Sequence, residues 1–227
     1  EKVNYIQDNI LQAYESDFSK HTTNSEANKI SLIWNGIPSQ LAKENKKFVY
    51  QAIKPGARAR EYEDALNWLN DANLIYKTYN VTKPVFPLTA YHDLSSFKVY
   101  LNDVGLLRRM SRLDSRIILE GHKLFEEFKG SFTENYVFTM LNNFYDGIPN
   151  YYTFDRYEID FLLQYHNQII PVEVKSGKSH NHISLTKFHE KYNNEISICF
   201  SLDNLKKDGN IVNIPLYLVE YLDQILK

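Results

Sequence analysis

Two apolar runs on either side of His166 and Asn167 constrain the fold more than any other feature of this sequence. The runs cover residues 159–165 and 168–175. Two apolar segments separated by two polar residues are typical of two β-strands joined by a tight hairpin turn. With His166 and Asn167 as the loop, Tyr165 lies opposite Gln168, and this pairing fixes the register of the whole hairpin.

The predicted register gathers charged residues on one face of the hairpin. Counting outward from the turn places Asp160 opposite Glu173 and Glu158 opposite Lys175. Because side chains alternate along a strand, these four residues share a face. The other face is predicted to face the core and carries only apolar residues, namely Ile159, Phe161, Leu163, Ile170, Val172 and Val174.

Two opposed carboxylates on neighbouring strands need a compensating group. Two like charges about 5 Å apart repel by about 3 kcal/mol at an effective dielectric constant near 20. Protonation of one acid, the ammonium of Lys175 or a bound hard cation could relieve this repulsion. Mg²⁺ suits the position, since it usually binds one or two carboxylates and completes its shell with water and substrate phosphate.

Asp160 followed by Glu173-Val174-Lys175 resembles the motif of the PD-(D/E)xK phosphodiesterases, a superfamily that includes restriction enzymes and RecB-type nucleases. The resemblance implies that Asp160 and Glu173 bind Mg²⁺ or Mn²⁺, with the Val174 carbonyl as a further ligand. It also implies that Lys175 orients or activates the attacking water. The alternative is a surface hairpin in which Glu158 pairs with Lys175 and the two acids are solvated.

The region from residue 116 to 227 predicts the rest of a restriction-endonuclease-like αβββαβ domain. A helix is expected over 132–144, strands over 151–154 and in the hairpin, a helix over 184–192 and a strand over 195–201. Glu134 falls in the first turn of the first helix. It is either a third acid of the metal site, as in the superfamily, or the partner of Ser131 in a capping box.

Residues 23–115 predict a winged-helix-like domain, preceded by an amphipathic linking helix within residues 1–22. Helices are expected over 26–34, with a break at 36–38, and over 57–72, followed by a strand over 75–81 and another over 97–101. Asn73 is expected to end the second of these helices in a left-handed conformation. If the domain reads DNA, Arg58 and Arg60 lie at the start of the recognition helix.

Three segments of the first half carry a second resemblance: SLIWNGIPSQLAKENKKFVY, GARAREYEDALNWLNDANLIYK and FKVYLNDVGLL. Together with EIDFLL and PVEVKSG they resemble the C-terminal region, itself of unknown function, of bacterial and archaeal AAA-type ATPases. This resemblance implies an ATPase module upstream as a partner, and the chain, which begins at Glu1 without Met, is expected to be a fragment. No ATP site is expected within it, because the run Gly177-Lys178-Ser179 lacks the first glycine of a Walker A loop.

Composition restricts the possible partners. The formal net charge is −2 and the pI about 6.4, so any DNA contact must come from a local patch, for which Lys178, Lys187 and Lys191 are the candidates. A single cysteine and the lack of a long apolar run favour a cytoplasmic protein without a membrane partner. An oligomer is possible.

Three functions therefore compete for this α/β (α+β) chain. The first is a Mg²⁺-dependent nuclease acting on DNA through Asp160, Glu173, Lys175 and Glu134. The second is an inactive nuclease-like domain that regulates the ATPase or binds a protein. The third is a winged-helix module that binds DNA without chemistry.

Overall fold

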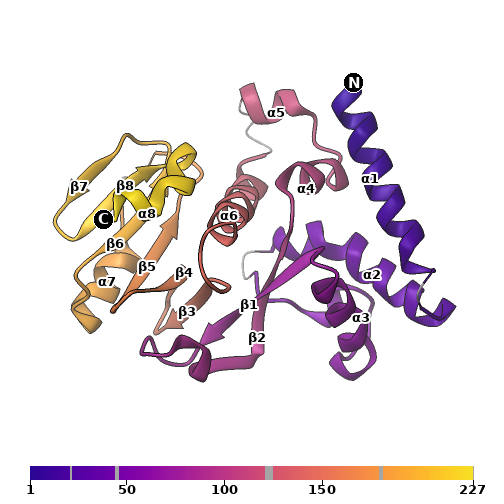
Figure 1. Cartoon of the computed structure of the whole chain (residues 1–227), viewed down its shortest axis with the longest axis horizontal. Coiled ribbons are helices and arrows are strands. Elements are labelled where there is room, and N and C mark those ends of the chain that lie inside the picture. The colour runs from indigo at the N-terminus through magenta and orange to yellow at the C-terminus, as the bar shows by residue number, and fades with distance from the viewer. Residues whose placement is uncertain (21, 44–45, 121–124, 179–180, 227) are drawn as a thin grey trace. The chain divides into compact units, whose positions relative to one another are not determined.

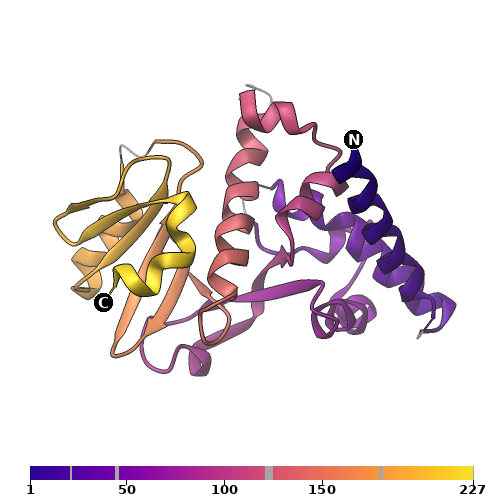
Figure 2. The same ribbon diagram turned by 45° about the horizontal axis from the view of Figure 1, so that its top comes forward.

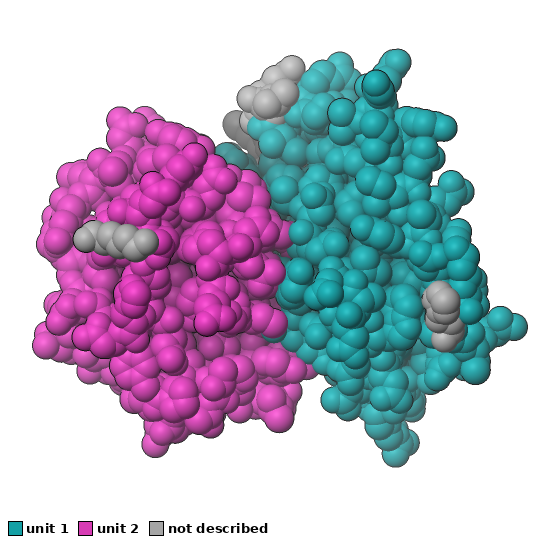
Figure 3. Space-filling model, in the orientation of Figure 1, with its two compact units in different colours: residues 1–77, 99–132 teal, residues 78–98, 133–227 magenta. Residues whose placement is uncertain are grey.

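The computed structural model describes residues 1–20, 22–43, 46–120, 125–178 and 181–226, so Ser179 of the Gly177-Lys178-Ser179 run lies outside the described residues. The chain is a mixed α/β protein, and its described strands form an eight-stranded sheet in the order β2-β1-β3-β4-β5-β6-β8-β7 (Figure 1). It divides into two compact units, residues 1–77 with 99–132 and residues 78–98 with 133–227 (Figure 3). Strands β1 and β2 therefore each contribute residues to both units.

Unit 1 is mainly helical. Its elements are α1 (Lys2–Phe18), α2 (Asn24–Leu41), the 3-10 helix η1 (Tyr50–Ala52), α3 (Ala59–Asp71), α4 (Val104–Met110), α5 (Ser115–Glu120), the start of α6 (Glu126–Asn142), and parts of β1 (Ile75–Val81) and β2 (His92–Leu101). Helix α1 packs on α2 and α4, which lie beside it in Figure 1 and Figure 2. The ring of Phe18 at its end contacts those of Trp34 in α2 and Trp68 in α3. No described helix of the chain is both long and apolar enough to cross a bilayer.

Two of the predictions for unit 1 can be compared directly with its helices. The predicted break at 36–38 is wrong, because α2 continues through Gly36 and Pro38 to Leu41. Buried Ile33, Trp34 and Ile37 anchor this part of the helix, and their packing outweighs the cost of a helical proline. The predicted end of α3 is confirmed: Asn73 has φ +55°, and the Leu74 amide donates to the Leu69 carbonyl.

Unit 2 holds most of the sheet. Its further elements are η2 (Leu88–Tyr91), β3 (Asn150–Phe154), β4 (Tyr157–Tyr165), β5 (Gln168–Val174), α7 (Ile183–Tyr192), β6 (Ser197–Ser201), β7 (Lys206–Asp208), β8 (Ile211–Pro215), η4 (Leu216–Tyr221) and α8 (Leu222–Ile225). Strand β4 is antiparallel to β3 and to β5, while β6 is parallel to β5. The order from α6 to β6 is thus helix, three strands, helix and strand.

Helices cover both faces of β4. Phe161 contacts Phe138 of α6, whereas its neighbour Leu162 belongs to a buried cluster with Leu185 and Phe188 of α7. Consecutive strand residues point to opposite faces, so α6 and α7 lie on different sides of the strand. The hairpin is therefore a central part of the core rather than a surface ribbon.

Candidate functional site

The hairpin has the predicted register. Tyr165 pairs with Gln168, and the pairing continues without a shift to Phe161 and Val172, the positions next to Asp160 and Glu173. His166 has φ +50°, which gives the two-residue turn its left-handed conformation. The carboxyl-terminal end of β5 and the first half of β4 thus meet at the predicted acids.

A bulge in β4 was not predicted. Tyr152 of β3 pairs with Ile159, but Asn150 pairs with Leu162, so β4 has one more residue than β3 across this stretch. An extra residue interrupts the alternation of side chains and bends the strand. Ile159 consequently lies in the same buried cluster as Leu162, and the prediction that it shares a face with Phe161 is wrong.

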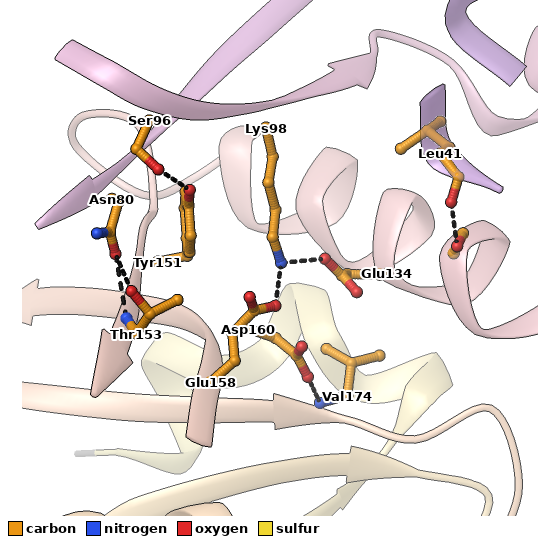
Figure 4. Close-up of polar contacts among 11 residues, drawn as sticks. Leu41, Asn80, Ser96, Lys98, Glu134, Tyr151, Thr153, Glu158, Asp160 and Val174 are labelled. Carbon is orange, nitrogen blue, oxygen red and sulfur yellow. Dashed lines mark hydrogen bonds and ion pairs between the residues drawn. The ribbon is translucent and has the colours of Figure 1, made fainter. Parts of the chain in front are cut away.

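Asp160 sits at this bulge and bonds to the neighbouring strand. Its Oδ2 accepts a hydrogen bond of 2.7 Å from the amide of Val174, the residue between Glu173 and Lys175 (Figure 4). A charged acceptor on a backbone amide makes a strong bond. The bond fixes the Asp160 carboxylate next to the Glu173-Val174-Lys175 segment.

Glu173 is buried, with 6% of its surface exposed. Its Oε1 lies 2.6 Å from the ammonium of Lys175. Its Oε2 is buried and accepts no hydrogen bond from any described residue, and the Nδ1 of His182 lies 3.9 Å from it. Since a buried carboxylate oxygen is normally satisfied, this atom is the candidate ligand for a cation at the hairpin.

Lys175 is partly exposed, with 39% of its side chain accessible, and so can reach a substrate. Burial lowers its pKa, but the hydrogen bond and charge of Glu173, together with the charge of Asp160, raise it, and the net pKa lies above its ordinary value. At neutral pH the side chain is therefore an ammonium, which can donate hydrogen bonds but cannot accept a proton.

The sequence analysis missed a further member of the site, Lys98 of β2. Its side chain is fully buried, and its Nζ lies 3.1 Å from Glu134 Oε1 and 2.6 Å from Glu158 Oε1 (Figure 4). The ammonium also lies 4.9 Å from the centre of the Tyr151 ring. Burial lowers the pKa of Lys98, but Glu134, Glu158 and Asp160 raise it to a net value well above the ordinary one.

These contacts correct two predictions. The capping box is wrong: α6 begins at Glu126, so Glu134 lies in its middle, and the Ser131 hydroxyl donates to the Leu41 carbonyl at 2.6 Å. Glu158 makes its ion pair with Lys98 rather than with Lys175, because the bulge interrupts the alternation between Glu158 and Asp160.

The candidate DNA-contacting residues come from both units, and some of them already have an acidic partner. Lys178 is exposed, whereas Lys187 lies 2.6 Å from Glu190 and Lys191 lies 3.3 Å from Asp155. Arg58 and Arg60 are exposed at the start of α3 in unit 1. Two of the five basic side chains thus have an acidic partner.

The residues at the hairpin fit a divalent cation held by few protein ligands. No described group of three or more His, Cys, Asp and Glu side chains lies close enough to form a metal site alone. Mg²⁺ does not need such a group, since one or two carboxylates and a substrate phosphate suffice. Four carboxylates and two ammonium groups take part in these contacts, and carboxylate oxygens are ligands that Mg²⁺ uses in proteins.

The fold and this cluster define the chain as a mixed α/β protein with a charged site at a central hairpin. Comparison with known families places it further: residues 1–116 match the model of a domain of unknown function, DUF8612, and the chain belongs to this family. Residues 129–219 match a second domain of unknown function, DUF4143, which is commonly associated with AAA ATPases. No curated protein and no solved structure matches the chain.

Proposed function

We propose that unit 2 is a Mg²⁺- or Mn²⁺-dependent phosphodiesterase of the PD-(D/E)xK type that acts on DNA, within the C-terminal region of an AAA-type ATPase. The observation that carries the proposal is the buried Glu173 carboxylate: one oxygen lies on Lys175, and the other accepts no hydrogen bond from the part of the chain that the structure describes. Asp160 of β4 accepts a hydrogen bond from the amide of Val174, the residue after Glu173 on β5. Burying this much negative charge is costly unless a cation balances it.

Each residue of the motif has a defined role in the proposal. Asp160 and Glu173 hold the ion, with the Val174 carbonyl as a further ligand. The bound ion supplies a nucleophilic hydroxide and charge stabilisation at the phosphate. Lys175 donates hydrogen bonds to the attacking water or to a phosphate oxygen, because its raised pKa keeps it protonated. Glu134 contributes through Lys98 rather than by direct contact with the ion.

The arrangement of elements supports an endonuclease-like domain. The order α6, β3, β4, β5, α7 and β6 is the αβββαβ order expected from the sequence. Strand β4 is antiparallel to β3 and to β5, and β6 is parallel to β5. In unit 1, the order α2, η1, α3 and the neighbouring strands β1 and β2 supports a winged-helix-like part. Arg58, Arg60 and Lys178 would then supply contacts to DNA phosphates.

The first prediction concerns metal-dependent cleavage. The full chain should cleave DNA with Mg²⁺ or Mn²⁺ but not with EDTA. Asp160→Ala and Lys175→Ala should each lower the cleavage rate at least about 100-fold, because each substitution removes a group that stabilises the transition state. The rates are measured on single-stranded, double-stranded and branched DNA.

Matched controls are Asp208→Ala and Lys206→Ala, an acid and a lysine that are both exposed on β7. Both should keep wild-type rates. Cleavage that persists in the Asp160 and Lys175 variants would show that the activity does not come from this site.

A second candidate function is an inactive nuclease-like domain that binds the ATPase module, and one observation favours it. Lys98 already pairs with two of the acids, as a structural ion pair would. In that case no DNA substrate is cleaved with any divalent ion, while the chain binds the ATPase module in a titration. Absence of both cleavage and binding would exclude both candidates.

A further inference from the structure

Lys98 lies where two carboxylates from distant parts of the chain converge. Glu134 comes from α6 and Glu158 from β4, and both direct an oxygen to the same ammonium. Asp160, two residues from Glu158, is close enough to raise the pKa of Lys98. Converging carboxylate oxygens are also the usual ligands of a hard divalent cation.

The two lysines of the cluster differ in their access to solvent. The Lys98 side chain is 0% exposed and that of Lys175 is 39% exposed. A substrate can therefore reach Lys175 but not Lys98, which makes Lys98 a positioning residue. Removing its ammonium would remove the ion pairs that Lys98 makes with Glu134, which is almost fully buried, and with Glu158.

We propose that Lys98 is an internal cation that occupies the position a second divalent ion would take between Glu134 and Glu158. The hairpin site is thereby restricted to one metal ion, at Asp160 and Glu173. The restriction to one ion rests on the proposed function, whereas the role of Lys98 as a substitute for an ion does not. Two-metal phosphodiesterases hold their ions about 3.5–4 Å apart, and here a protein side chain would replace one of them.

The test is the number of Mn²⁺ ions bound per chain, measured by electron paramagnetic resonance of the free ion during titration of the full chain. The wild type should bind one ion and Lys98→Met should bind two. The matched control is Lys77→Met, since Lys77 is also buried but its ammonium bonds to the amide oxygen of Asn67. This variant should bind the same number of ions as the wild type.

The outcomes separate this inference from the proposed function. One ion in both the wild type and Lys98→Met would overturn the inference and leave the proposed function intact. No ion in the wild type and one in Lys98→Met would support the inference while contradicting the proposed metal site.

A folding defect in Lys98→Met also gives a decisive result. If that variant does not fold, K98M/E134Q/E158Q should fold, because the charges of the two carboxylates that pair with Lys98 are removed together with it. It should bind no more Mn²⁺ than the wild type. A triple variant that also fails to fold would overturn the inference, since the defect would then not come from unpaired carboxylates.

Discussion

Charge compensation by Lys98, at the scale of single residues, makes the carboxylate cluster of unit 2 possible. An ammonium with no exposed surface is stable only if its hydration is replaced by close acceptors, and Glu134 and Glu158 supply them at 3.1 and 2.6 Å. Their charges outweigh burial and raise the pKa of Lys98. The pKa of Lys98 therefore differs between the folded and the unfolded chain, so protonation of Lys98 is coupled to folding.

A second prediction follows from the direction of this shift. A lysine with a raised folded pKa stabilises the protein fully below its unfolded pKa of about 10.4, and this contribution is lost as the pH rises through the folded value. Between pH 10.4 and 11.5 the free energy of unfolding of the wild type should fall more steeply than that of K98M/E134Q/E158Q, by up to about 1.4 kcal/mol per pH unit. Urea unfolding at several pH values measures both slopes, and equal slopes would contradict the assigned coupling.

The motif residues could be predicted from the sequence, but Lys98 could not. Asp160, Glu173 and Lys175 lie on two strands joined by two residues, so local alternation was enough to bring them together. Lys98 meets partners that are 36 and 60 residues away along the chain. Nothing in the run from Phe97 to Leu101 indicates those partners, and the bulge at Asp160 leaves no sign in the apolar pattern.

At the scale of elements, the start of helix α2 is set by local side-chain hydrogen bonds, whereas its interior is set by burial. Helix α2 begins with a complete capping box, in which the Glu26 amide donates to Thr23 Oγ1 and the Thr23 amide donates to the Glu26 carboxylate. This signal is local, because Thr23 and Glu26 are three residues apart, yet the helix was expected to begin only at residue 26. The continuation of the helix through Pro38 could not be predicted from the sequence, because it depends on the burial of Ile33, Trp34 and Ile37 in the folded chain.

A third prediction tests the start of α2. Thr23→Ala removes the hydroxyl that caps the helix and should lower the free energy of unfolding by about 1 kcal/mol. Thr23→Ser keeps a hydroxyl and should stay within a few tenths of a kcal/mol of the wild type. Urea unfolding compares the three proteins, and equal losses in both variants would show that the hydroxyl does not stabilise the helix.

In the chain as a whole, the regions that match the two family models do not coincide with the two compact units. The family models cover residues 1–116 and 129–219 without interruption, whereas each compact unit is built from two separate segments. The family regions and the units differ because β1 and β2 belong to the first family region in sequence, whereas β1 pairs with β3 and β2 lies beyond β1 in the same sheet. A net charge of −2 leaves DNA binding to local groups of basic residues, so the proposed activity depends on the hairpin site rather than on a general attraction to phosphate.

The location of a bound Mn²⁺ ion tests the central claim most directly. Crystals of the full chain soaked in millimolar Mn²⁺ should show an anomalous scattering peak within coordination distance of the carboxylates of Asp160 and Glu173, and the peak should be lost in Asp160→Ala. A peak only at other residues, or no peak at a Mn²⁺ concentration that supports DNA cleavage, would contradict the proposed metal site.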